Sequence, residues 1–91
     1  MVKLGGFRKN WRRRHFVLTT DALSYFKHAA SEAPRGTVRL GDVLRVDSAA
    51  EGCEKPNAFK VVTRGRTFVL SCDSAEERAE WQSALAQALR G

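Results

Sequence analysis

The chain has 91 residues, 43% of them hydrophobic and 29% charged, which excludes a disordered tail and fits one small globular domain spanning residues 1–91. Its apolar runs are four residues or fewer, too short for a membrane-spanning helix or a signal peptide, so we expect a soluble, cytoplasmic protein. The net charge of +6 lies entirely in residues 1–20, since the remaining residues hold ten basic and ten acidic groups. This asymmetry indicates a surface that binds polyanions: an anionic membrane, a phosphorylated headgroup or nucleic acid. A merely solvated basic face is the alternative.

The cysteines, Cys53 and Cys72, stand apart in the sequence, with no CxxC pair and no histidine at metal-ligand spacing. We therefore expect free thiols rather than a disulfide, and no metal site.

The first half of the chain has the alternating pattern of short strands. Residues 1–4 form the end of a first strand that looks trimmed at its N-terminus, and residues 11–19 form the second, in which Arg12 and Arg14 alternate with their neighbours. A short polar break separates this strand from a third over residues 23–28, so the two are expected to pair as a hairpin. A fourth strand, residues 36–40, follows a loop over residues 29–35.

The second half continues this rhythm and then changes. Residues 43–46 are predicted to be a strand and residues 47–56 an exposed loop. The strands predicted over residues 57–63 and 66–72 flank Arg64-Gly65, where the glycine is expected to supply the positive φ of a tight turn. Seven short strands predict a mainly β fold, an antiparallel barrel or sandwich.

The C-terminal segment is predicted to be a helix of about 16 residues that begins at Ser74 or Ala75. Ser74 and Glu77 have the spacing of a capping box. An apolar stripe follows at helical spacing, and we expect it to cover an open end of the barrel rather than bind a partner; it consists of Trp81, Leu85, Ala88 and Leu89.

The basic stretch from Lys3 to Leu18, followed at the far end of the chain by Glu80-Trp81 in the predicted helix, resembles the pattern of pleckstrin homology (PH) domains of the phosphoinositide-binding type. The stretch from Lys3 to Leu18 matches the basic first hairpin of that family, with a lysine, a glycine-containing loop and then Arg12, Arg14, Phe16 and Val17. Further matches cover the whole chain: Leu23-Ser24-Tyr25-Phe26, Pro34-Arg35-Gly36, Lys55-Pro56-Asn57-Ala58-Phe59 and Glu80-Trp81. The resemblance implies a seven-stranded PH barrel capped by a C-terminal α-helix.

The basic hairpin suits the recognition of an inositol phosphate. Strand alternation directs Arg12 and Arg14 to one face, with Lys3 opposite on the paired strand, and arginine favours bidentate phosphate contacts. The resemblance implies that Lys3 and Arg14 hold the inner phosphates and that further contacts come from Tyr25, Arg35 and Asn57. Each has a structural alternative: an exposed strand lysine, a packed tyrosine or a turn-capping asparagine.

The loop between the first two strands is a candidate membrane contact, because Phe7 lies beside Arg8 and Lys9. Phe7 would insert among lipid headgroups, unless it folds back onto its own loop. In related sites a basic residue often occupies this position and helps to choose among headgroups.

The sequence thus favours a non-catalytic module that targets the cytoplasmic face of a membrane in signalling, and we expect this to be the plasma membrane. The expected ligand is a 3-phosphorylated inositol lipid, PI(3,4,5)P3 or PI(3,4)P2, and no cofactor is expected. The alternative is a PH domain that binds proteins and has only non-specific affinity for anionic lipid. We expect no nucleic-acid partner, because the aromatic residues are not laid out as a stacking surface. We expect no catalysis either, because the histidines, His15 and His28, lie in no catalytic motif.

Overall fold

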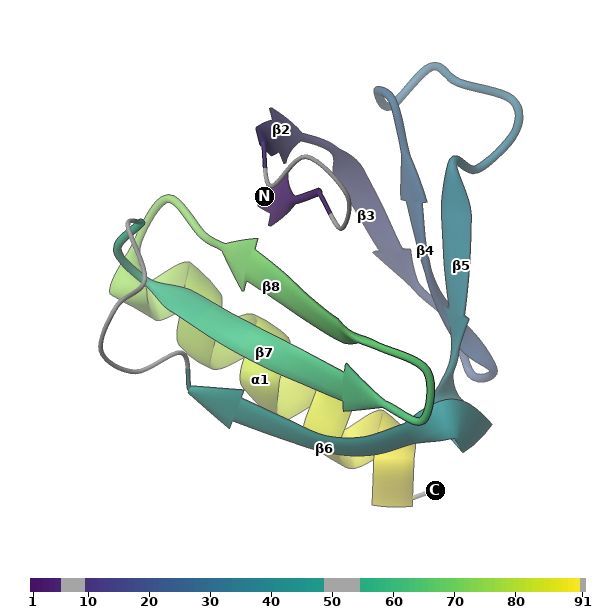
Figure 1. The fold of residues 1–91 in the computed structure, drawn as a ribbon, viewed down its shortest axis with the longest axis vertical. Coiled ribbons are helices and arrows are strands. Elements are labelled where there is room, and N and C mark those ends of the chain that lie inside the picture. The colour runs from purple at the N-terminus through teal and green to yellow at the C-terminus, as the bar shows by residue number, and fades with distance from the viewer. Residues whose placement is uncertain (6–9, 49–54, 91) are drawn as a thin grey trace.

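The computed structural model describes residues 1–5, 10–48 and 55–90. Its elements form two antiparallel sheets and one long helix (Figure 1). The five-stranded sheet has the order β2-β1-β8-β7-β6 and the three-stranded sheet the order β3-β4-β5. The bounds are β1 Val2–Leu4, β2 Trp11–Arg13, β3 His15–Leu18, β4 Ala22–Phe26, β5 Gly36–Arg39, β6 Val43–Ser48, β7 Ala58–Thr63, β8 Thr67–Ser71 and α1 Ala75–Arg90, with a 3-10 turn, η1, at Leu40–Asp42. The mainly β fold closed by a C-terminal helix is confirmed.

The predicted second strand is wrong in one respect, because residues 11–19 form two strands in different sheets. β2 pairs with β1, whereas β3 pairs with β4. Arg14 lies at the bend between them, where its N–H donates to the Met1 carbonyl at 2.9 Å. An alternating pattern shows which side chains share a face but not which neighbour a strand has, so it missed this change of sheet.

Other boundaries moved by a few residues. The strand predicted to end at Val46 continues to Ser48, with Asp47 opposite Lys60 and Ser48 opposite Phe59. The rest of the predicted exposed loop lies largely outside the described residues. The hairpin at Arg64-Gly65 is confirmed, but Gly65 does not have the expected positive φ. Thr63 closes the turn instead, since its N–H and its hydroxyl both donate to the Arg66 carbonyl, at 2.9 and 2.7 Å.

The hydrophobic core lies between the sheets and α1. Phe59, Val61 and Leu85 have exposed fractions of 0%, so the inner face of β7 and one face of the helix are withdrawn from water. One half of the predicted capping box is present, with the Ser74 hydroxyl accepting the Glu77 N–H at 3.1 Å. Leu89, the last member of the apolar stripe, is 36% exposed, so the helix packs mainly through the rest of its stripe.

Cys72 is a buried free thiol, and burial raises its pKa to about 11. Cys53 lies outside the described residues. No described helix is long and apolar enough to cross a membrane. Among the described residues, no group of three or more His, Cys, Asp or Glu side chains could hold a metal ion.

Candidate anion-binding site

Lys3 is the buried cation around which the candidate site is arranged. β1 lies between β2 and β8, and the Lys3 side chain is directed into the barrel, with an exposed fraction of 9%. Its Nζ lies 4.9 Å from the ring centroid of Tyr25 and 5.7 Å from that of Phe68. The negative faces of the two rings therefore stabilise the ammonium, although no described carboxylate lies within 4.0 Å of it.

The electrostatics show which other cations approach Lys3. Its pKa is lowered from the ordinary value, first by burial and then by the positive charges of Arg66 and Arg14. Burial disfavours the charged ammonium, and two neighbouring guanidinium groups disfavour it further. Lys3, Arg14 and Arg66 thus form a cationic cluster, with no described carboxylate within 4.0 Å of any of them.

Arg66 is a member of this cluster that the sequence analysis missed. It precedes β8 in the β7–β8 hairpin, and its guanidinium carbon lies 4.1 Å from the centroid of the Phe68 ring. Phe68 thus contacts two cations, since Lys3 faces the same ring. The hairpin was predicted, but its position beside Lys3 depends on the β1–β8 pairing, in which Lys3 lies opposite Leu70. No local pattern reveals that pairing.

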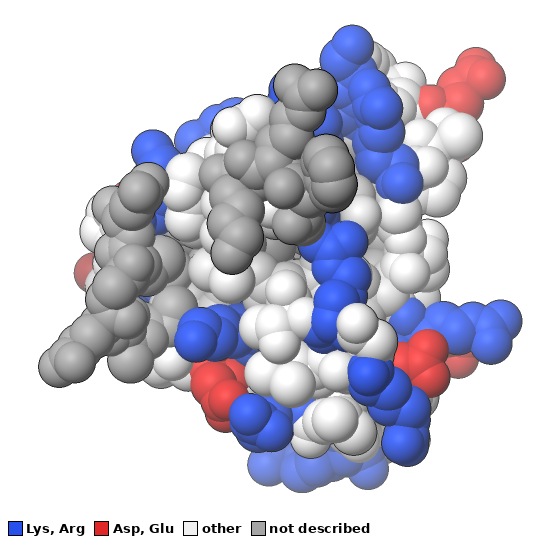
Figure 2. Space-filling model, viewed as in Figure 1, with Lys and Arg blue, Asp and Glu red and all other residues white. Residues whose placement is uncertain are grey.

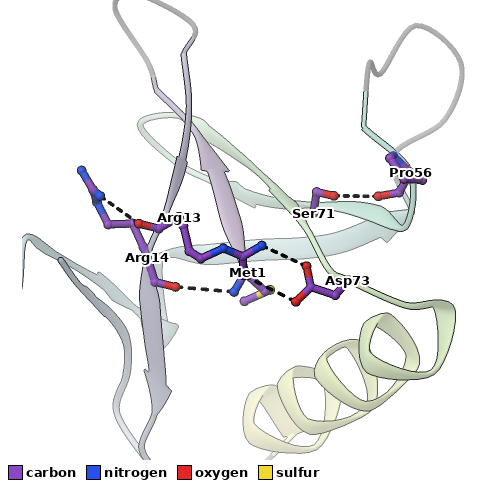
Figure 3. A network of polar contacts seen from close by, with 6 residues as sticks. All are labelled: Met1, Arg13, Arg14, Pro56, Ser71 and Asp73. Carbon is purple, nitrogen blue, oxygen red and sulfur yellow. Dashed lines mark hydrogen bonds and ion pairs between the residues drawn. The ribbon is translucent and has the colours of Figure 1, made fainter. Parts of the chain in front are cut away.

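The two arginines predicted on the second strand have different positions. Arg12 lies directly opposite Lys3 in the β1–β2 pairing but is exposed. Arg14 is half-buried at the bend after β2, and its Nη1 donates to the Arg13 carbonyl at 2.9 Å (Figure 3). The positive charge of Arg14 helps to lower the pKa of Lys3, so Arg14 belongs to the cluster. The bend after β2 brings Arg14 there, whereas we expected strand alternation to do so.

Arg13 takes no part in the cluster. It forms a bidentate ion pair with Asp73, with nitrogen to oxygen distances of 3.0 and 3.4 Å (Figure 3). The guanidinium of Arg13 lowers the pKa of the Asp73 carboxyl. The pair is exposed to solvent and connects β2 to the segment before α1.

Tyr25 borders the site from the second sheet. It lies opposite Phe16 on β3 and Gly36 on β5, and its ring crosses the glycine so closely that a Cβ there would lie 2.3 Å from the Tyr25 hydroxyl oxygen. Gly36 is therefore required by this close approach. The N–H of Arg35 donates to the Tyr25 carbonyl at 2.7 Å, so Arg35 lies next to Tyr25 while its own side chain stays exposed.

Asn57 is set apart from Arg66. It lies just before β7, whereas Arg66 follows the other end of that strand. Its φ of 53° is left-handed, and its carbonyl accepts the Cys72 N–H at 3.0 Å. This geometry gives Asn57 a definite role in the turn, which asparagine tolerates well. The predicted membrane-contacting residues, Phe7, Arg8 and Lys9, lie outside the described residues.

The space-filling view extends this picture to the surface. Figure 2 shows Lys and Arg side chains running down one face of the molecule, from the end of β4 and β5 toward the β7–β8 hairpin, with acidic side chains mainly to the sides. Such a surface attracts polyanions before any specific contact forms.

The fold and its cationic cluster define a PH-type module, and the chain belongs to the PH domain family, whose model matches residues 1–90. It is 33% identical to "Pleckstrin homology domain-containing protein 1" of Arabidopsis thaliana, over 98% of this chain and 65% of that protein. It is 32% identical to "Pleckstrin homology domain-containing family A member 2" of Mus musculus, over 98% of this chain and 22% of that protein. The chain thus spans less than two thirds of the length of these relatives.

Solved structures agree with this assignment. The carboxyl-terminal PH domain of pleckstrin is 35% identical, with a TM-score of 0.83 over 97% of this chain and 89% of that one. The same domain in complex with D-myo-Ins(1,2,3,4,5)P5 gives a TM-score of 0.78 at 35% identity, over 96% of this chain and 89% of that one.

Proposed function

We propose that this chain is a non-catalytic module that binds phosphorylated inositol headgroups through the cluster of Lys3, Arg14 and Arg66. The observation that carries the proposal is a buried lysine beside two arginines with no described carboxylate near them: burial first, and then the positive charges of Arg66 and Arg14, lower the pKa of Lys3. Like charges held together in a partly buried position cost folding free energy, and a bound polyanion relieves that cost. The same arrangement without a ligand has no evident structural benefit.

The similarity to pleckstrin supports the class of ligand. A PH domain of pleckstrin has been solved with D-myo-Ins(1,2,3,4,5)P5, a ring that carries several phosphate groups. In this chain the lysine supplies a compact charge and the arginines supply planar donor groups that match phosphate oxygens. Tyr25 and Arg35 border the same region and are proposed as further contacts, with Arg12 at its exposed margin.

The preferred headgroup is proposed to carry a 3-phosphate, as in PI(3,4,5)P3 or PI(3,4)P2, which would recruit the protein peripherally to the cytoplasmic face of the plasma membrane. Phe7, Arg8 and Lys9 are proposed to contact the bilayer. Each basic residue near an anionic surface adds about 1 kcal/mol to binding, so a loop contact and a headgroup pocket would reinforce each other.

Calorimetric titration with soluble Ins(1,3,4,5)P4 tests the pocket. Lys3→Met and Arg14→Gln are each expected to weaken binding by about ten- to a hundredfold, as for the loss of a hydrogen bond to a charged group. Lys60→Met is the matched control, because Lys60 lies on the outer face of β7, next to the buried Phe59. Equal affinities for the wild type and all three variants would leave only a diffuse basic surface.

Sedimentation with vesicles that each contain one phosphoinositide tests the lipid preference and the loop. Selective sedimentation with 3-phosphorylated lipids is expected, and Phe7→Ala is expected to weaken vesicle binding while leaving the affinity for the soluble headgroup unchanged. Equal binding to every anionic vesicle would instead favour a protein-interaction module with non-specific lipid affinity.

A further inference from the structure

A second basic surface lies between β5 and the β7–β8 hairpin. It is an open groove of about 430 Å³, and the residues that matter for its chemistry are Thr37, Arg39, Asp42, Arg64 and Arg66. Lys3, Arg14 and Tyr25 do not line it, so it differs from the cationic cluster and shares only Arg66 with it. A second hollow shares Thr37, Arg39 and Asp42 with the groove and extends from them toward Asp21 and Ala22, at the start of β4.

One wall of this groove is the outer edge of a sheet. β5 ends the order β3-β4-β5, and β4 is the only described strand that pairs with it (Figure 1). The Leu40 N–H donates to the Asp21 carbonyl at 3.0 Å, beside the opposed pair Ala22 and Arg39. In an antiparallel ladder this makes Arg39, and by alternation Thr37, positions whose N–H and C=O groups point away from β4. These groups are available to an added strand.

The charge of the groove is mainly positive. Arg39, Arg64 and Arg66 form no ion pair with any described carboxylate, and Asp42 is the one acidic residue among the described residues that line the groove. The Arg64 N–H donates to the Asp42 carbonyl at 3.2 Å, which ties the hairpin to η1 and holds the two walls together. An acidic occupant would meet Arg39 and Arg64 and avoid the carboxylate of Asp42.

We propose that this groove binds an extended acidic segment of a partner protein, which adds to β5 as a fourth strand while its carboxylates pair with Arg39 and Arg64. A strand edge presents donors and acceptors together, at a repeat of about 7 Å for every second residue, and a peptide backbone matches both. An inositol phosphate offers mainly acceptors and would leave the outward carbonyls of β5 without donors. The strand edge therefore favours a protein segment over a headgroup.

The probe is an acetylated, fluorescently labelled peptide of about seven residues in which Glu and Val alternate, the length of an ordinary strand. Fluorescence anisotropy measures its affinity, and ¹⁵N NMR locates it. We expect the largest amide shifts at Thr37 and Arg39. We also expect Arg39→Glu and Arg64→Glu each to weaken binding by about tenfold or more, since like charges then face each other across the interface.

Two controls separate strand addition from general charge attraction. Lys55→Glu makes the same change of charge at the other end of β7, since Lys55 precedes this strand and Arg64 follows it. This variant should leave peptide binding unchanged. A peptide of identical sequence with an N-methyl group on every residue keeps its charge but has no backbone N–H to donate along either edge, so it should bind at least about tenfold more weakly. Circular dichroism of each protein variant verifies that it is folded.

Three results would overturn the proposal. One is equal affinity for the N-methylated and unmodified peptides, and another is an equal loss of binding in the Lys55→Glu control. The third is complete displacement of the peptide by Ins(1,3,4,5)P4 with shifts centred on Lys3 and Tyr25, which would mean that the peptide occupies the cationic cluster. The proposal is independent of headgroup binding, because Arg39→Glu should weaken peptide binding and leave Ins(1,3,4,5)P4 affinity within about twofold.

Discussion

Leu85 and Lys3 are both largely withdrawn from water, with exposed fractions of 0% and 9%, but their surroundings differ. Leu85 packs with Phe59 and Val61 in the apolar core. The Lys3 ammonium lies over the rings of Tyr25 and Phe68, with Arg14 and Arg66 nearby. The first region buries apolar surface, which stabilises folding by about 25 cal/mol per Å², and the second buries a charge, which costs free energy.

This difference indicates how stability and function are divided in the molecule. A chain of 91 residues has a modest core, so a region that opposes folding must be held in place by the rest. Titratable groups in such unfavourable surroundings are characteristic of binding sites. The comparison predicts that changes in the core mainly alter stability, while changes around Lys3 mainly alter ligand binding.

Truncation of the core should have the largest effect. Leu85→Ala is expected to lower the free energy of unfolding by about 2–5 kcal/mol, because it removes a fully buried side chain and leaves a cavity. Urea denaturation followed by circular dichroism measures the loss. Leu89→Ala, on the same helix but 36% exposed, is the control and should cost much less. Similar losses in both variants would show that the buried stripe is not what fixes α1.

Gly36 connects the two regions, and its substitution should have an intermediate effect. The added Cβ of Gly36→Ala would lie 2.3 Å from the Tyr25 hydroxyl oxygen and 2.4 Å from Cζ. The ring must move, at a cost of about 1–3 kcal/mol in stability. Moving the ring also removes an aromatic face from Lys3, so affinity for an inositol phosphate should fall as well.

A double-mutant cycle isolates the contact between Gly36 and Tyr25. In a Tyr25→Ala background, Gly36→Ala should lose most of its cost. Gly41→Ala is the matched glycine control, because a Cβ there meets no atom within 4 Å, and its effect should stay within about 0.5 kcal/mol. If Gly36→Ala is equally costly with and without Tyr25, the close approach of the ring is not the cause.

Local chemistry in the sequence was enough to predict much of the fold. Ser74 and Glu77 fixed the start of α1, and alternation with a two-residue turn gave the β7–β8 hairpin. Lys3 and Arg14 were assigned to a candidate site by resemblance, because their motif lies within one short stretch, and their role in binding stays a prediction. These features depend on residues that are near each other in the chain.

The missed features depend on distant pairings. Arg66 reaches the Lys3 region only because β1 pairs with β8, and no periodic pattern encodes that neighbour. The change of sheet at Arg14 was missed because it preserves the alternation on both sides. Gly36 was noted only as part of a motif. The reason that this position must be glycine is the Tyr25 ring on the adjacent strand, which leaves no room for a Cβ.

The smallest predicted effect concerns the charge on Lys3 and its sign. Because the folded-state pKa is lowered, the unfolded chain binds more protons between that pKa and the ordinary value of 10.5. Stability from this group therefore rises with pH across that window and is lowest below it, where the ammonium is fully charged in both states. Lys3→Met removes the effect, so the wild type should gain stability relative to this variant as pH rises toward 10.5.

Cys72 changes stability in the opposite direction, since its pKa of about 11 exceeds the ordinary 9.0. Because Cys72 is present in both proteins, its contribution cancels when their stabilities are compared. Urea midpoints measured in anion-poor buffer from neutral to alkaline pH provide the test, and a difference that shrinks or reverses would mean that Lys3 is stabilised as a cation. Saturating Ins(1,3,4,5)P4 should raise the folded-state pKa of Lys3 and so narrow this window, because its upper limit is the unfolded-state value of 10.5.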